Sequence, residues 1–458
     1  MHEAIGNSKN TIPVFLQLEV GEQFKEAVLE SPQSRLEAMQ TMGDSLEGNI
    51  GIDPDFAPVA TGKKDTPLIE KEFSSIEKTE QVLVRAELEL DDLHDVPEMV
   101  GDARVFSDPE ISTCLTCLND DHVGTASDVA NLLKLGDLHA EGHTGLDVAV
   151  AIIDAGFDIE HLQQKLNFSP SLDTDNSWIP EGVQTEPGQF NNKHGNMCAY
   201  AVLLAAPEAT LLDCATFARP PKPGQQLAGH LSSVLDVYQD LWRKRTSFGQ
   251  NALSSYSGLV VSNSWSVYNP AADYPTSHPG RYIDNPNHPF NLFTDLLNKS
   301  GIDLVFAAGN CGTECADGLC EGNTSNSIMG ANALNSTLTV AACNVNGERT
   351  GYSSQGPGIP GMFATKPDIS AYSHYLGSEA YGSGTADPGT SAACPLAAGV
   401  IAALRTNISS RDTPPSILYD QIRSSAGASA DIPAWNEDTG YGIINPIKLI
   451  QARQSLGV

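Results

Sequence analysis

The sequence predicts an α/β fold in which a parallel, twisted β-sheet carries helices on both faces, with a small α+β segment at the N-terminus. Short apolar runs such as VAVAII at 148–153 and LVFAA at 304–308 are typical of strands buried on both faces. These runs alternate with Ala-rich or amphipathic stretches of helical length, as expected for a parallel sheet. The 458 residues, 40% of them hydrophobic, suffice for one large domain and a smaller one.

The N-terminal region is acidic, and we expect residues 1–75 to be poorly ordered. Residues 1–120 hold 25 Asp and Glu against 9 Lys and Arg, a net charge of −16, and the whole chain has a net charge of −31. We expect a helix within Gly21–Met42, whereas residues 43–65 are rich in Gly, Pro and Asp and indicate a loop. This acidity argues against nucleic acid and anionic membrane surfaces as partners.

Residues 76–125 form a second predicted unit. Gln81–Glu89 alternates between apolar and polar residues like a half-buried strand. We predict a short helix over Asp91–Val100 and a second short strand over Ala103–Phe106. Residues 126–458 are then the expected main domain.

The main domain alternates predicted helices and strands along the chain. The predicted helices cover 126–138, 194–206, 229–245 and 291–300, and the predicted strands cover 148–153, 210–217, 259–262, 302–307 and 338–343. Active groups of such sheets gather at the carboxyl ends of the strands. Asp154, Ser264 and Asn310 lie at or just past such ends, so we expect them to lie along one edge of the sheet.

Ser391 lies where a tight turn opens an Ala-rich helix, within the stretch DPGTSAACP at 387–395. Gly389 permits a backbone that other residues resist, and the serine then sits at the positive end of the helix. A serine hydroxyl placed there becomes a nucleophile if a base is near. The alternative is a buried Ala-rich helix in which the serine is only a cap.

Three further motifs accompany this serine. Asp154-Ala-Gly follows a predicted strand, His194-Gly-Asn opens a predicted helix, and Ala307-Ala-Gly-Asn310 ends another strand. Together they resemble the motifs D-[ST]-G, H-G-T, A-A-G-N and G-T-S-x-A-x-P of the subtilisin-like serine proteases (subtilases, peptidase family S8). The resemblance covers roughly residues 135–449, and the order Asp, His, Ser is the subtilisin order.

The resemblance implies a subtilisin-like fold and a serine endopeptidase that hydrolyses peptide bonds through an acyl-enzyme. Ser391 would be the nucleophile and His194 its general base. Asp154 would orient the imidazole, and Asn310 would donate a hydrogen bond to the oxyanion. The partner it implies is a polypeptide substrate.

The resemblance also places a substrate-binding strand at residues 260–266. The substrate would add to it as an extra strand, and backbone at 264–266 and 306–309 would form the walls of the main specificity pocket. The implied substrate-binding residues are Ser264, Trp265, Ser266, Ala308 and Gly309. Trp265 has a second interpretation, as an ordinary buried residue of a core strand, which is compatible with the first.

Ala155 and Asn196 depart from the family motifs, and Ala392 and Cys394 fill the two variable positions of the serine motif. None of these residues removes a group that carries a proton or a charge. The changes are nevertheless compatible with a slow or narrowly specific enzyme. The rival hypothesis is a catalytically weak or inactive subtilase fold that serves as a binding or scaffold protein. A third hypothesis is a different serine hydrolase such as an esterase. Those enzymes usually show G-x-S-x-G with the histidine last, whereas in this chain the serine comes last.

The resemblance further implies an inhibitory N-terminal segment and no required cofactor. Such a segment would block the active site until cleavage between Ser112 and Ser127; the alternative is a purely structural extension. Calcium is common in the family, and the acidic loop 317–321 suggests a structural site, but no ligand set is recognisable and we assign no metal ligand.

Nine cysteines are scattered along the chain, with Cys311, Cys315 and Cys320 in one loop and Cys114 and Cys117 as a close pair. A metal site or disulfides would explain these groups. No secretory signal is visible, so free thiols and a cytoplasmic location are the expectation. No apolar run of about 18 residues exists, so no membrane span is expected.

Overall fold

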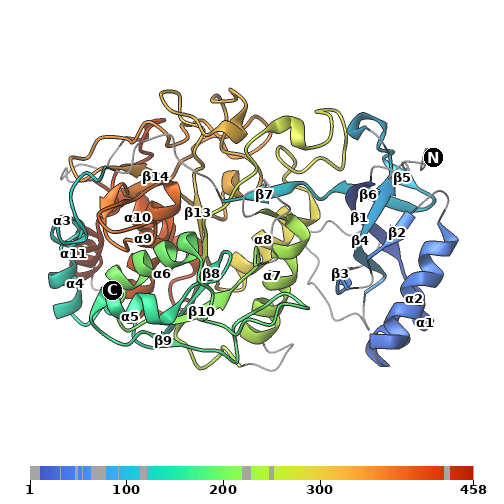
Figure 1. The fold of residues 1–458 in the computed structure, drawn as a ribbon, viewed down its shortest axis with the longest axis horizontal. Coiled ribbons are helices and arrows are strands. Elements are labelled where there is room, and N and C mark those ends of the chain that lie inside the picture. Colours follow the sequence, from blue (N-terminus) through green and yellow to red (C-terminus); the bar gives the residue numbers. More distant parts are fainter. Residues whose placement is uncertain are drawn as a thin grey trace, which may run out of the picture. The chain divides into compact units, whose positions relative to one another are not determined.

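The computed structural model divides into two compact units (Figure 1). It describes residues 11–30, 32–46, 50–53, 55–62, 79–90, 92–113, 121–218, 228–246, 252–427 and 434–456. The first unit comprises Met1–Pro109, His230–Asp236 and Ala271–Leu292; the second comprises Glu110–Gly229, Val237–Pro270 and Phe293–Val458.

The second unit is built on a seven-stranded parallel sheet with the strand order β15-β14-β13-β12-β8-β10-β9. Its strands are β8 (Val148–Ile153), β9 (Ser171–Leu172), β10 (Thr210–Cys214), β12 (Gly258–Asn263), β13 (Asp303–Ala307), β14 (Leu338–Cys343) and β15 (Ile369–Tyr372). Strands β8, β12, β13 and β14 are buried along their full length, as their continuous apolar runs predict.

Helices cover both faces of this sheet. Neighbouring residues of a strand point to opposite faces. From β12, the Ser262 hydroxyl lies 3.8 Å from Cys394 Sγ on α9 (Thr390–Arg405), whereas Asn263 accepts a 2.8 Å hydrogen bond from the Tyr238 hydroxyl on α7 (Leu231–Arg245). Helix α6 (Lys193–Ala205) packs against α9 and β8. The predicted α/β fold with helices on both faces is confirmed.

Shorter elements complete the second unit. They are β7 (Glu110–Ser112), α3 (Ala126–Leu132), α4 (Leu135–Ala140), α5 (Ile159–Leu166), β16 (Tyr375–Leu376), β17 (Ala386–Asp387), α10 (Pro415–Ser425) and α11 (Pro446–Leu456). The single helix predicted over 126–138 is two helices, because Lys134 adopts a left-handed backbone with φ 53°. Within the described residues, no helix has the length and apolar character needed to cross a membrane.

The first unit is built on a six-stranded antiparallel sheet with the order β2-β4-β1-β6-β5, to which β3 adds beside β4. Its strands are β1 (Thr11–Glu19), β2 (Ile50–Ile52), β3 (Val59–Gly62), β4 (Gln81–Glu89), β5 (Met99–Val100) and β6 (Ala103–Ser107). Two helices, α1 (Glu22–Glu30) and α2 (Pro32–Ser45), connect β1 to β2, and α8 (Pro289–Lys299) and β11 (Ala228–His230) each begin in one unit and end in the other.

The structure corrects two expectations for this region. Residues 1–75 are not poorly ordered where the structure describes them, because β1 lies between β4 and β6 and buries Val14, Leu16 and Leu18 in the core. Their spacing of two residues is a strand pattern. The helix predicted over Asp91–Val100 is wrong: that stretch holds a single 3₁₀ turn followed by strand β5, and Pro97 interrupts any longer helix.

The first unit takes part of its core from two later stretches of the chain. Tyr274 belongs to the same buried cluster as Val14 and Val105, and its hydroxyl donates to the Phe106 carbonyl at 3.2 Å. Ser232 donates through its backbone N–H and hydroxyl to the buried carboxylate of Asp108, at 2.9 and 2.7 Å. The N-terminal sheet is therefore completed by residues far along the sequence.

A buried ion pair fixes the end of helix α9 to the sheet. Arg405 is fully buried and donates from Nε and Nη2 to the two carboxylate oxygens of Asp303 on β13, at 2.6 and 2.7 Å. Its Nη1 donates to the carbonyls of Ile408 and Thr413 at 3.1 and 2.7 Å. Each of the three guanidinium nitrogens thus has an acceptor, as burial of a charge requires.

We expect Arg405→Met to lower the free energy of unfolding by about 3–5 kcal/mol, because it leaves the Asp303 carboxylate buried without its partner. The double variant Asp303→Leu, Arg405→Met removes both charges and should lose distinctly less. Urea unfolding followed by fluorescence measures both. An equal loss of unfolding free energy in the single and double variants would contradict the cost assigned to an unpaired Asp303 carboxylate.

Candidate functional site

Asp154 and His194 form a buried hydrogen-bonded pair. Asp154 directly follows strand β8, and its Oδ2 lies 2.7 Å from Nδ1 of His194. The other carboxylate oxygen accepts the N–H of Ala155 at 2.8 Å. Asp154 is fully buried and His194 is 5% exposed. The carboxylate therefore fixes the orientation of the imidazole and leaves its Nε2 on the far side.

Helix α6 presents His194 in its first turn. Its N-cap is Asn192, whose side-chain oxygen accepts the N–H of Gly195 at 2.9 Å. A Cβ atom on Gly195 would lie 1.9 Å from the Gly156 carbonyl oxygen. Because no other residue fits this close approach, the glycine after His194 lets the start of α6 lie against the loop that carries Asp154.

Ser391 lies in the first turn of α9, after Gly389, whose φ of +85° is a conformation that favours glycine. The Ser391 hydroxyl donates to the Ser264 carbonyl at 3.4 Å. Within the described part of the chain, this hydroxyl makes no hydrogen bond to Nε2 of His194. Such bonds are often long without substrate and tighten in the complex, so the geometry is compatible with a nucleophile and its base.

The amide of Asn310 has one end fixed and the other free. Asn310 follows strand β13, is fully buried, and accepts at Oδ1 from the Thr390 N–H and hydroxyl at 3.0 and 2.9 Å. Because the N–H can only donate, the hydrogen bonds assign the oxygen to this side and the NH₂ group to the other. Nδ2 has no partner among the described residues.

Two buried polar atoms in this region thus lack partners within the described part of the chain: Nε2 of His194 and Nδ2 of Asn310. Buried polar groups almost always have partners, so such exceptions call for an explanation. Both belong to residues whose other polar atoms are held by hydrogen bonds. An amide that enters the site would supply partners for both atoms, because its carbonyl oxygen can accept from Asn310 Nδ2 and its N–H can donate to His194 Nε2.

The predicted substrate-binding residues lie on two neighbouring segments. Ser264 and Ser266 follow strand β12, and Ala308 and Gly309 follow β13, its parallel neighbour. A Cβ atom on Gly309 would lie 3.9 Å from the Ser266 hydroxyl. The Trp265 side chain is fully buried, stacks edge-on against Phe306 and donates from Nε1 to Asn263 Oδ1 at 3.2 Å, so it is a core residue.

The Cys198 thiol, which the sequence did not single out, lies next to the Asp154–His194 pair. It is one turn after His194 on α6, with Sγ 3.7 Å from Nδ1 of His194 and 3.4 Å from the Ser391 carbonyl oxygen. Burial, with Asp154 nearby, raises the pKa of this thiol well above its usual value, so it stays neutral. The i, i+4 spacing on a helix was the signal that could have pointed to it.

One of the two departures from the family motifs, Asn196, has a clear structural role. The Asn196 side-chain oxygen accepts the Asp158 N–H at 2.7 Å, which ties the chain after Asp154 to helix α6. Ala155, Ala392 and Cys394 are buried, and each offers a small side chain at a crowded position.

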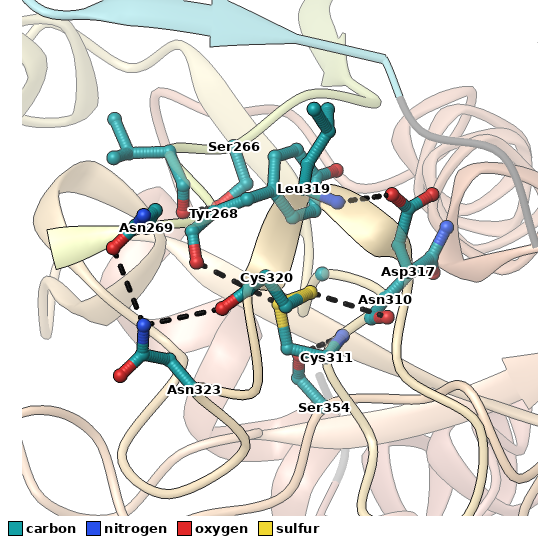
Figure 2. The surroundings of a disulfide bond; sticks show 12 residues. Ser266, Tyr268, Asn269, Asn310, Cys311, Asp317, Leu319, Cys320, Asn323 and Ser354 are labelled. Atoms are coloured by element: carbon teal, nitrogen blue, oxygen red, sulfur yellow. Dashed lines mark hydrogen bonds between the residues drawn. A yellow bond between two sulfur atoms is a disulfide. The ribbon is translucent and has the colours of Figure 1, made fainter. Parts of the chain in front are cut away.

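Two of the loop cysteines form a disulfide directly after Asn310. Cys311 and Cys320 are bonded (Figure 2), and Cys315 is also disulfide-bonded. The expectation of free thiols is wrong for these three residues, whereas Cys198, Cys214, Cys343 and Cys394 are free. Cys114 and Cys117 lie outside the described residues. The pairing of cysteines depends on the folded loop and cannot be deduced from spacing alone.

The acidic loop 317–321 does not gather its carboxylates for a calcium ion. Asp317 accepts the Leu319 N–H at 2.8 Å, and Glu321 accepts from the Asn269 side chain at 2.7 Å. Across the described ranges, the group of three His, Cys, Asp or Glu residues with converging ligand atoms is Asp154, His194 and Cys198. Its carboxylate and imidazole already bind each other.

Comparison with protein families matches residues 145–442 to the subtilase family. Subtilisin E of Bacillus subtilis (strain 168) is 28% identical over 320 residues, which cover 68% of this chain and 68% of that protein. Subtilisin of Bacillus pumilus is 28% identical over 320 residues, which cover 68% of this chain and 94% of that protein. The crystal structure of MycP1 from the ESX-1 type VII secretion system is 17% identical with a TM-score of 0.47, covering 75% of this chain and 89% of that chain.

The Asp387 carboxyl, four residues before Ser391, gives a pH prediction. It is fully buried, accepts from the Ser378 N–H and hydroxyl at 2.7 and 2.5 Å, and burial raises its pKa to about 7. The unfolded chain releases this proton near pH 4. The folded state therefore binds more protons between these values, and stability falls as the pH rises through about 7.

We expect the melting temperature of the wild type to fall, relative to that of Asp387→Asn, between pH 4 and pH 8. Asparagine has no proton to lose, so the variant lacks this contribution to the pH dependence. Thermal unfolding at closely spaced pH values measures the difference, and Asp102→Asn at an exposed position serves as the control. A difference between wild type and Asp387→Asn that stays constant with pH would refute the assignment.

Proposed function

Since this chain belongs to the subtilase family and is a serine-type endopeptidase, we propose that Asp154, His194 and Ser391 carry out its peptide hydrolysis and that Asn310 stabilises the oxyanion. The observation that carries this proposal is the pair of unpartnered buried atoms, His194 Nε2 and Asn310 Nδ2, in residues otherwise held in place. These are the two atoms that such a reaction needs free.

In the first step, Ser391 Oγ attacks the carbonyl carbon of the scissile peptide bond while His194 Nε2 takes the hydroxyl proton. The imidazolium then gives that proton to the leaving amine, and the C–N bond breaks to leave an acyl-enzyme. A water molecule attacks the ester with His194 again as base, which releases the carboxyl product and restores the serine. Throughout, Asp154 holds Nδ1–H and stabilises the imidazolium.

Two donors face the developing negative charge in this proposal. The first is Asn310 Nδ2, oriented by the hydrogen bonds that Thr390 makes to Oδ1. The second is the Ser391 backbone N–H, which lies in the first turn of α9 and therefore has no acceptor within the helix. Donors fixed before the reaction need no reorganisation in the transition state, which is why they are effective.

The chain's own β7 supports a substrate strand at residues 264–266. Ser112 and Ser266 exchange two antiparallel backbone hydrogen bonds, with N···O distances of 3.2 and 3.3 Å. The backbone at 266 thus accepts an added strand, which is how an extended polypeptide binds to a sheet edge. We infer that the segment around Ser112 occupies the position of a substrate and inhibits the uncleaved chain.

A subtilase fold that serves only as a scaffold is not favoured. A binding protein has no use for a hydrogen-bonded Asp–His pair beside a serine at a helix N-terminus, with two buried atoms left unpartnered.

The proposal predicts that a fluorophosphonate labels the wild type at one site and leaves Ser391→Ala unlabelled, because only an activated serine reacts. Intact mass measures the adduct and also shows whether the N-terminal segment has been removed. Asn310→Ala should hydrolyse a peptide substrate about 10²–10³-fold more slowly, the known effect of removing the corresponding donor from a bacterial subtilisin. A folded wild type that is not labelled, even without its N-terminal segment, would overturn the proposal.

The inhibitory role of the segment predicts that Ser112→Pro speeds the labelling of uncleaved chains. Proline cannot donate the hydrogen bond to the Ser266 carbonyl, and one such bond is worth about 1 kcal/mol, or roughly a fivefold change in occupancy. Ser112→Ala keeps both backbone bonds and is the matched control. The measurement is the labelling rate of the full-length species, resolved by intact mass. Equal rates for the two variants would contradict the inhibitory role of the segment around Ser112.

A further inference from the structure

The Cys311–Cys320 disulfide closes a short loop that begins immediately after the proposed oxyanion donor (Figure 2). Within this loop the regular structure is a single 3₁₀ turn, Gly318–Cys320, capped by Asp317. Irregular backbone of this kind is held by few hydrogen bonds of its own. The loop is also held by the disulfide of Cys315 and by the hydrogen bond from the Gly312 N–H to the Tyr352 carbonyl at 2.8 Å. The Cys311–Cys320 bond is the restraint that ties the end of the loop back to its starting point.

The closed loop packs against the backbone of Asn310. The Asp317 N–H donates to the Asn310 carbonyl at 2.9 Å, and Cys320 Sγ lies 3.7 Å from the same oxygen. On the other side, Ser354 accepts the Cys311 N–H at its hydroxyl, at 3.0 Å, and donates its own N–H to the Gly309 carbonyl at 2.9 Å. The peptide that follows the donor is thus held from two directions.

The same loop is anchored to the segment that follows the proposed substrate strand. Cys311 Sγ lies 3.8 Å from the Tyr268 carbonyl oxygen, and the two bonded cysteines form one buried cluster with Tyr268. Asn323 donates to the Cys320 carbonyl and to the Asn269 side chain, at 3.1 and 3.2 Å. Figure 2 shows these contacts meeting around the disulfide. The loop that the disulfide closes therefore contacts both the backbone of Asn310 and the segment that follows residues 264–266.

We propose that the Cys311–Cys320 disulfide is a positioning element for Asn310 in the transition state. This inference rests on the proposed function, in which Asn310 Nδ2 binds the oxyanion. Thr390 fixes only the Oδ1 end of the amide, so the place of Nδ2 depends on the backbone that the loop holds. An error of about 1 Å in such a group is known to cost up to 10²-fold in rate.

The test is a double-mutant cycle between the disulfide and Asn310. We expect Cys311→Ala, Cys320→Ala to lower kcat about tenfold with KM changed less than about twofold, because the lost interaction exists only in the transition state. In the Asn310→Ala background, the same pair of substitutions should cause no further loss of kcat, since residues that act through one another are not additive.

Two further variants keep the test sharp. Leu319→Ala changes a partly exposed side chain of the same loop and should leave kcat and KM unchanged. If the double cysteine variant does not fold, Asp317→Ala is the alternative, because it removes the cap of the 3₁₀ turn and keeps the disulfide. This variant should lower kcat by less than the tenfold expected for the cysteine pair, and only when Asn310 is present.

The outcomes separate this inference from the function on which it rests. An unchanged kcat, or the same factor of loss with and without Asn310, would show that the disulfide is only a structural brace and would overturn the inference while leaving the function intact. A wild type with no more peptidase activity than Ser391→Ala would overturn the proposed function and this inference with it.

Discussion

The close packing of helix α9 against α6 is the constraint on which the site depends. All of α9 is buried, and a Cβ atom on Gly399 would lie 2.4 Å from the Val202 carbonyl oxygen of α6. Because His194 opens one helix and Ser391 opens the other, the distance between the helices sets the distance between these side chains. Small residues at the contact are therefore a requirement of the proposed chemistry as well as of the core.

The register of the sheet places the remaining groups. Ile153, Asn263 and Phe306 are paired level with one another on the parallel strands β8, β12 and β13. The residues that come next in each strand then emerge at the same edge, as in other parallel sheets. Asp154 and Asn310 therefore lie at the same edge of the sheet although they are far apart in the sequence.

This alignment explains how much the sequence could predict. Buried parallel strands are continuous apolar runs, so their ends, and with them Asp154, Ser264 and Asn310, can be located without a structure. His194 and Ser391 were identifiable because each lies at the start of an Ala-rich helix, close to a glycine. Their mutual geometry could not be predicted, since it depends on how tightly the two helices pack.

Other features depend on contacts that leave no local pattern. The disulfide between Cys311 and Cys320 is one of several pairings that the spacing allows, and Cys198 reveals its place only once α6 is docked. Strand β1 had a readable alternation, but the acidity of the region suggested disorder instead. Strand β5 formed where a helix was predicted, because pairing with β6 outweighed the weak helical preference of the stretch around Pro97.

The composite core of the first unit has a consequence for synthesis on the ribosome. Domains usually fold as units, with the N-terminal one first while the chain is still growing. Here Ser232 holds the buried Asp108, and Tyr274 fills the cluster that contains Val14 and Val105. The N-terminal unit therefore cannot reach its final packing until the ribosome has passed Leu292. The antiparallel sheet of the first unit therefore remains incompletely covered while four strands of the parallel sheet, β8, β9, β10 and β12, are synthesised.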